Sequence, residues 1–112
     1  MNILFKSKKL QKVCSDSKVM SRELGEARTR RLQQRLLELR AAESLAEVSH
    51  LPPARCHELK GNRKYHFSVD LDQPYRLIFI PSSTPVPLLA DGGIDRESIK
   101  DVTIIEIVDT HE

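Results

Sequence analysis

Residues 64–80 read KYHFSVDLDQPYRLIFI, and this stretch decides the fold. Apolar side chains recur at every second position on both sides of Asp72-Gln73-Pro74, a sequence typical of a turn. The pattern predicts two strands, at 64–71 and 75–80, joined as an antiparallel hairpin. Each strand has one largely apolar face, which suits packing against helices.

The opposite face of the first strand is polar, and that of the second carries Arg76 together with Ile78 and Ile80. In the first strand His66, Ser68 and Asp70 share this face, and in the second Arg76 points away from Leu77 and Phe79. We therefore expect Arg76 to lie on an open face of the sheet, because an arginine within an apolar strand needs solvent or a partner.

Three further segments have the composition of strands. They are residues 2–6, residues 55–59 and the Val- and Ile-rich segment 101–109. Residues 60–63, with Gly61 and Asn62, predict a turn after the second of them.

The helical pattern is concentrated in the first half of the chain. Ser7 predicts the N-cap of a short helix to about Cys14, and a longer helix is expected from Ser21 to about Val48, before Pro52-Pro53. The apolar face of the longer helix repeats at spacings of three and four, with Thr29, Leu32, Leu36 and Leu39. Segment 81–100, with three prolines and Gly92-Gly93, predicts a long loop with one helical turn at 95–100.

This order of elements favours an α+β fold in one domain that spans residues 1–112. The N-terminal strand and the helices are expected to pack on one face of an antiparallel sheet of four to five strands. No apolar run approaches the ~20 residues of a membrane span, and the first residues are too short an apolar stretch for a signal peptide. These features predict a cytoplasmic protein.

The charges are distributed unevenly along the chain. Residues 1–64 hold 15 Lys and Arg against 7 Asp and Glu, a formal charge of +8, whereas residues 65–112 hold 3 against 9, a charge of −6. A basic half can attract a polyanion or an acidic protein, although a solvated helix would have the same composition. On the longer helix Arg28, Arg31 and Arg35 form a stripe that is either solvated or contacts RNA or a partner.

Several site chemistries are not indicated. Cys14 and Cys56 form no CxxC pair and are expected to be buried free thiols. No phosphate-binding glycine loop, nucleophile elbow or metal-ligand spacing of histidines and cysteines occurs. We expect neither a metal ion nor another cofactor.

A basic and histidine-containing set on the predicted strands and turns is the best candidate for chemistry. Its members are His57, Lys60, Arg63, Lys64, Arg76, Asp109 and His111. Cleavage of RNA by the neighbouring 2′-hydroxyl needs a base, an acid and positive charge around the phosphate, and histidine, arginine and lysine supply these. Each residue alone also has an ordinary explanation, such as a solvated turn charge or a histidine bonded to backbone.

The chain resembles a known family over several of these segments. The stretches Cys56–Arg63, Phe67–Val69 and Tyr75–Phe79, and the ending Ile105–His111, are similar to HigB-type plasmid-maintenance killer proteins of the RelE/ParE superfamily. The resemblance implies a toxin that cleaves messenger RNA on the ribosome and is inhibited by an antitoxin, expected to be a helix-turn-helix protein. It also implies active-site positions at His57, Lys60, Arg63, Arg76, Asp109 and His111.

One position departs from the family pattern. Thr110 stands where the family usually has tyrosine, and threonine can neither stack on a base nor match the acidity of a phenol. Two alternatives to a nuclease therefore stay open: a toxin that binds DNA gyrase, as the ParE branch does, and an inactive relative that serves as a binding partner.

Overall fold

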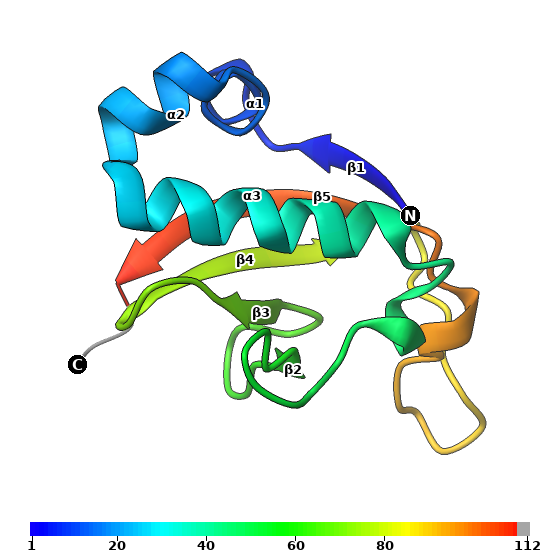
Figure 1. Cartoon of the computed structure of the whole chain (residues 1–112). Coiled ribbons are helices and arrows are strands. Elements are labelled where there is room, and N and C mark those ends of the chain that lie inside the picture. Colours follow the sequence, from blue (N-terminus) through cyan, green and yellow to red (C-terminus); the bar gives the residue numbers. More distant parts are fainter. Residues whose placement is uncertain (110–112) are drawn as a thin grey trace.

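The computed structural model describes residues 1–109, which form a five-stranded sheet with helices on one face (Figure 1). The strands are β1 (Asn2–Phe5), β2 (His57–Glu58), β3 (Phe67–Asp70), β4 (Tyr75–Pro81) and β5 (Asp101–Asp109). They are ordered β1-β5-β4-β3-β2, and all neighbouring pairs are antiparallel except β1 and β5. The α+β class is thus confirmed, with the correction that the sheet is mixed, because the N-terminal strand pairs in parallel with the last one.

Three α-helices lie between β1 and β2. They are α1 (Lys8–Ser15), α2 (Ser17–Leu24) and α3 (Glu26–Ala41). Ser7 caps α1 as expected, through a bond from the Leu10 amide to its hydroxyl. The expectation of one helix from Ser21 to Val48 is wrong: Asp16 caps α2, and Gly25, at φ +80°, separates α2 from α3.

After α3 the chain forms a short 3-10 helix, η1 (Leu45–Glu47), and a loop that leads to β2. The long segment 81–100 contains a bridge between Leu88 and Ile94 and a second 3-10 helix, η2 (Arg96–Ser98), where one helical turn was expected. The Leu45 amide donates to the Ile99 carbonyl, which ties η1 to η2.

The core lies between α3 and the sheet (Figure 1). The predicted face of α3 is buried, with Leu32, Leu36 and Leu39 packed into the same cluster as Leu77 and Phe79 of β4. The rings of Phe67 and Phe79 stack with centroids 5.9 Å apart. Both cysteines are buried and free, as expected, and burial raises the pKa of each thiol to about 11.

Two of the predicted strands, at 55–59 and 64–71, are shorter than the alternation indicated. The segment at 64–71 pairs only over Phe67–Asp70, and the one at 55–59 only over His57–Glu58. Tyr65 has φ +64° and Arg55 has φ +49°, so both residues leave the extended conformation next to these strands. The strands end where the backbone turns, although the polarity of the side chains continues to alternate.

A bulge in β5 determines which side chains of this strand face the helices and which lie on the opposite face. Ile78 pairs with Glu106 and Phe79 pairs with Ile104, which leaves Ile105 without a partner on β4. The extra residue shifts the alternation, so that Glu106 and Val108 lie on the face opposite the helices. No helix among residues 1–109 is long and apolar enough to cross a membrane.

Arg35 is a buried cation at the joint between α3 and the sheet. Its side chain is 2% exposed. The Nε atom donates to the backbone carbonyl of Asp70 at 2.8 Å, and Nη1 donates to the Glu38 carboxylate at 3.1 Å. The expectation that Arg35 shares an exposed stripe with Arg28 and Arg31 is therefore wrong, because its guanidinium fastens α3 to β3.

We predict that Arg35→Ala lowers the free energy of unfolding by about 2–3 kcal/mol, since hydrogen bonds from a charged donor are lost and the Asp70 carbonyl is left buried and unpaired. Urea unfolding followed by circular dichroism measures this change. Arg31→Ala, four residues away on the exposed side of α3, is the control and should shift the value by less than about 0.5 kcal/mol. Equal stabilities for the two variants would contradict the role given to Arg35.

Candidate active site on the open face of the sheet

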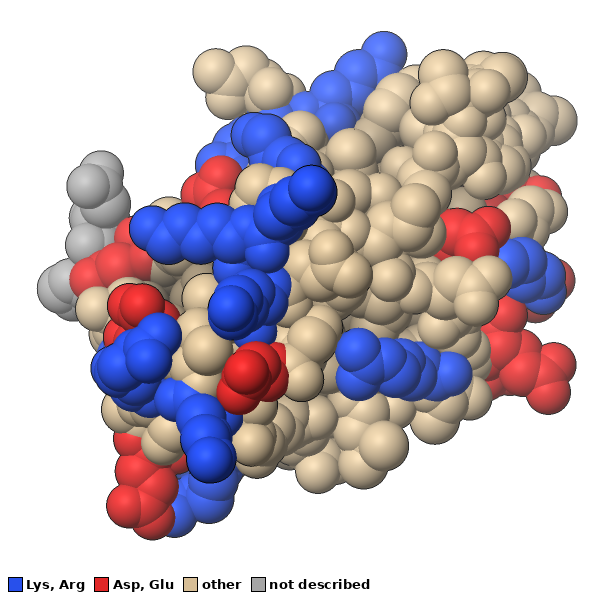
Figure 2. Space-filling model, turned by 90° about the horizontal axis from the view of Figure 1, so that it is seen from above, with Lys and Arg blue, Asp and Glu red and all other residues tan. Residues whose placement is uncertain are grey.

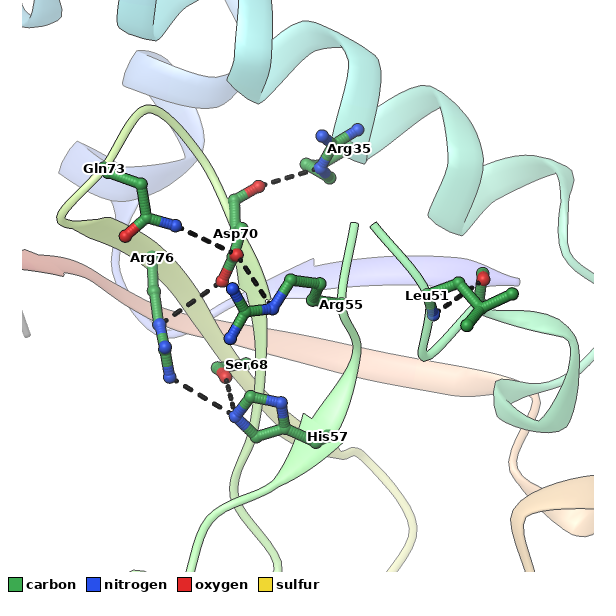
Figure 3. Close-up of polar contacts among 9 residues, drawn as sticks. Arg35, Leu51, Arg55, His57, Ser68, Asp70, Gln73 and Arg76 are labelled. Atoms are coloured by element: carbon green, nitrogen blue, oxygen red, sulfur yellow. Dashed lines mark hydrogen bonds and ion pairs between the residues drawn. The ribbon is translucent and has the colours of Figure 1, made fainter. Parts of the chain in front are cut away.

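A buried carboxylate on β3 organises the face opposite the helices (Figure 3). Asp70 pairs across the hairpin with Arg76 of β4, and its side chain is 3% exposed. One carboxylate oxygen, Oδ1, lies 3.3 Å from Arg76 Nε, and the other, Oδ2, lies 3.4 Å from Arg55 Nε. Gln73 in the turn also donates to Oδ2, at 3.1 Å. Asp70 thus holds two guanidinium groups beside each other.

The backbone of Asp70 is also fixed on both sides. Its amide donates to the Ala54 carbonyl at 2.7 Å, and its carbonyl accepts from Arg35 at 2.8 Å. These bonds connect β3 to the segment before β2 and to α3. The position of the carboxylate therefore depends on the core and does not depend on solvent-exposed side chains alone.

His57 on β2 completes this cluster. It pairs with Ser68 of β3, and its Nε2 atom lies 3.3 Å from Arg76 Nη1 and 3.5 Å from Ser68 Oγ. Because a guanidinium can only donate, the contact with Arg76 requires a lone pair on His57 Nε2. The geometry thus favours the neutral imidazole.

The electrostatic environment of His57 also favours its neutral form. Burial lowers the pKa of His57 below its ordinary value of 6.5, and the positive charges of Arg76 and Arg55 lower it further. The Asp70 carboxylate and a backbone hydrogen bond at Arg55 act in the opposite direction without reversing the shift. A neutral imidazole at pH 7 can accept a proton, as a general base must.

The open face continues from this cluster toward β5. Ser68, Ile78 and Glu106 follow His57 in one cross-strand row. Arg63, from the loop before β3, reaches this row and pairs with Glu106 at 3.7 Å between Nη2 and Oε2. Both side chains stay more than one third exposed, so a polyanion can compete for this guanidinium.

Two predicted lysines lie apart from the Asp70 cluster. Lys60 and Lys64 are exposed in the segment between β2 and β3, where they line a groove of about 440 Å³ together with Glu58, Leu59 and Gly61. The Lys64 ammonium lies 5.0 Å from the centre of the Tyr65 ring. These residues lie at the border of the open face, next to Glu58 at the end of β2.

The predicted arginines of α3 are on the helix layer, across the sheet from His57. Arg28 bonds Asp72 through Nε at 3.0 Å and lies 3.4 Å above the Tyr75 ring, so its charge is already engaged. Arg31 is exposed, and Arg35 is buried as described. An RNA strand on the open face cannot reach all three, which corrects the expectation of a single RNA-binding stripe.

Asp109 and His111 are the predicted site residues near the C-terminal end of the sequence. Asp109 pairs with Tyr75 in the sheet register, so it lies on the face of Tyr75 and Leu77, whereas Arg76 lies on the other face. The expectation that Asp109 joins Arg76 is therefore wrong. Thr110 and His111 lie outside the described residues.

Sequence reasoning did not include three members of the cluster, Arg55, Ser68 and Asp70. The signal for Asp70 was present, because a hairpin around the predicted turn places residue 70 opposite residue 76. Ser68 was on the correct face but had no known neighbour. Arg55 carried no comparable signal, since its contact depends on a backbone with positive φ.

The cluster can bind an anion and exchange a proton, but it does not resemble a metal centre. Within residues 1–109 there is no group of three or more His, Cys, Asp or Glu side chains placed to hold a metal ion. Arg76 and Arg55 carry two positive charges, and Asp70 carries one negative charge. The site is therefore net positive beside a neutral imidazole. Guanidinium forks of this kind match phosphate oxygens.

Comparison with known families places the chain by its sequence. Residues 3–85 match the family described as RelE-like toxin of the type II toxin–antitoxin system HigB. The matched range runs from β1 to the residues after β4 and contains the whole Asp70 cluster. No curated protein matches the chain.

We predict that His57 titrates below pH 6.5 and that Arg76→Gln raises its pKa, because the substitution removes a positive charge 3.3 Å from Nε2. Heteronuclear NMR of the imidazole as a function of pH measures both values. Arg30→Gln, on the exposed side of α3, is the control and should leave the His57 titration unchanged. A His57 pKa that does not respond to Arg76→Gln would show that the two groups are not coupled.

Proposed function

Because the chain belongs to the HigB-like family of RelE-like toxins of type II toxin–antitoxin systems, we propose that it is an endoribonuclease that cleaves messenger RNA on the ribosome. The contact of a neutral imidazole with a guanidinium on the open face is the observation that carries this proposal. A toxin of this type has an antitoxin as its partner, and we propose a helix-turn-helix protein for this role.

The proposed reaction uses side chains and needs no metal ion. His57 accepts the proton of the RNA 2′-hydroxyl, and the oxygen attacks the adjacent phosphorus. Arg76 stabilises the negative charge that gathers on the phosphate oxygens. The bond to the 5′-oxygen breaks, and an acid donates a proton to this leaving group; His111, beyond the described residues, is our candidate. The products are a 2′,3′-cyclic phosphate and a 5′-hydroxyl.

Other residues would position the site and the RNA. Asp70 acts through Arg76 and Arg55 and is a positioning residue, since its buried oxygens face these two side chains. Arg63, Lys60 and Lys64 lie along the border of the open face, where they can follow the RNA backbone. No role beside Arg76 is proposed for Asp109, because it lies on the other face.

We also propose that residues 1–112 form one toxin domain. The family match ends at residue 85, before β5. However, β5 lies between β1 and β4 in the sheet, so the matched range has no continuous sheet without it. Val102 and Ile104 of β5 are buried in the common core.

We predict that Arg76→Ala and His111→Ala each reduce messenger RNA cleavage by at least about a hundredfold and relieve growth arrest, because a charge-stabilising group or the acid is lost. Sequencing of messenger 5′ ends after induction, together with growth curves, measures the effect. Arg30→Ala, which removes an exposed arginine from α3, is the matched control and should cleave like the parent chain.

The same measurement distinguishes the alternatives. The second candidate function is a gyrase-binding toxin, and the observation that favours it is Thr110 in place of the family's usual tyrosine. Intact messages with DNA damage after induction would favour gyrase binding and contradict the nuclease. Unimpaired arrest in both the Arg76 and His111 variants would reject the assignment of the site.

A further inference from the structure

The last strand has an edge that its neighbour covers only in part. β1 pairs with β5 from Asn2 opposite Asp101 to Phe5 opposite Ile104. The Lys6 amide still donates to the Ile104 carbonyl, and the chain then turns into α1 at Ser7. β5 continues to Asp109 with β4 on its other side. Within residues 1–109, positions 105–108 therefore have no strand on the β1 side.

An apolar groove lies directly beside this uncovered edge. It has a volume of about 380 Å³ and is lined by Leu10 and Val13 of α1, by Leu24 of α2, and by Ile105 and Ile107 of β5. Ile107 pairs with Leu77 and therefore faces the helix layer, and it lines the groove together with Ile105 at the bulge. Unpaired backbone groups next to apolar side chains are what a strand needs to add to a sheet.

The chain segment that leads from β1 into α1, beside the groove, carries positive charge. Residues 1–15 contain Lys6, Lys8, Lys9 and Lys12 and no Asp or Glu, and all four lysines are exposed. Figure 2, seen from the side of α1 and α2, shows lysine and arginine side chains gathered over these helices. Two acidic residues, Glu23 and Glu106, also line the groove. Glu106 is already paired with Arg63. An acidic segment is thus favoured over a basic one.

We propose that an extended segment of the antitoxin pairs with β5 along residues 105–108 and fills this groove. The segment would carry apolar side chains at alternate positions, facing Leu10 and Leu24, and Asp or Glu near Lys9. A second copy of this chain is a poorer occupant, because edge-to-edge pairing would bring two sets of the four lysines together. The site lies beside α1 and α2 on the helix layer, away from the His57 and Arg76 cluster on the opposite face.

The direct test is hydrogen exchange of the full chain, free and in complex with its purified cognate antitoxin. Those amides of residues 105–108 that point to the open edge should exchange more slowly in the complex, because strand addition gives them hydrogen bonds, whereas the amides that point to β4 are already paired. Unchanged exchange of these amides in the complex would overturn the proposal. So would protection of the same amides in a dimer of the free chain, because the occupant would then be a second copy.

Variants on the groove test the same proposal by affinity. Leu10→Glu should weaken antitoxin binding at least about tenfold, because it removes an apolar contact and adds a charge that repels an acidic segment. Lys9→Glu should weaken binding about threefold to tenfold. The matched controls are Leu37→Glu on α3 and Lys18→Glu on α2, which are exposed and do not line the groove; both should stay within about twofold of the parent chain.

Equal affinities for the groove and control variants would overturn the proposal. Hydrogen exchange needs no substitution, so a misfolded variant cannot decide the outcome. The inference rests on the antitoxin partner that the family implies and not on the proposed nuclease activity, since both measurements use purified proteins without RNA. Failure of messenger cleavage and failure of edge pairing are therefore separate results.

Discussion

The ion pairs of the Asp70 carboxylate are the interactions on which the open face depends. A carboxylate this deeply buried is costly unless it is paired. Here Arg76 and Arg55 neutralise it, and Gln73 donates a further hydrogen bond. In return the carboxylate holds Arg76 where its Nη1 atom meets His57. One buried acid thus arranges a cation and a neutral imidazole on the open face of the sheet.

The same residue connects the site to the core. Its carbonyl accepts from Arg35, whose guanidinium is buried under α3, and its amide bonds Ala54 before β2. A helix, the loop after it and two strands are therefore joined at one residue of β3. This arrangement explains why Arg35 is buried, whereas Arg28 on the same helix pairs with Asp72 and Arg31 is exposed.

Much of the fold could be predicted from alternation and spacing. The hairpin around Asp72-Gln73-Pro74, the buried face of α3 and the last strand are confirmed because each has a clear apolar period. The break at Gly25 was missed, because the longer helix was expected to begin at Ser21, although its apolar face begins only at Thr29, beyond the glycine. Within the site, Arg76 and His57 were predicted and do meet. Asp109 was grouped with Arg76, but it pairs with Tyr75 on the other face, because the bulge at Ile105 shifts the alternation and leaves no mark in the composition.

The measurement that tests this account most directly is the single-turnover rate of messenger RNA cleavage on the ribosome by the Asp70→Asn variant. Asparagine keeps the shape and the backbone bonds but removes the charge that positions Arg76. We expect a folded protein whose cleavage rate is at least about tenfold lower than that of the parent chain. A folded Asp70→Asn protein that cleaves at the parent rate would contradict the central role of this carboxylate.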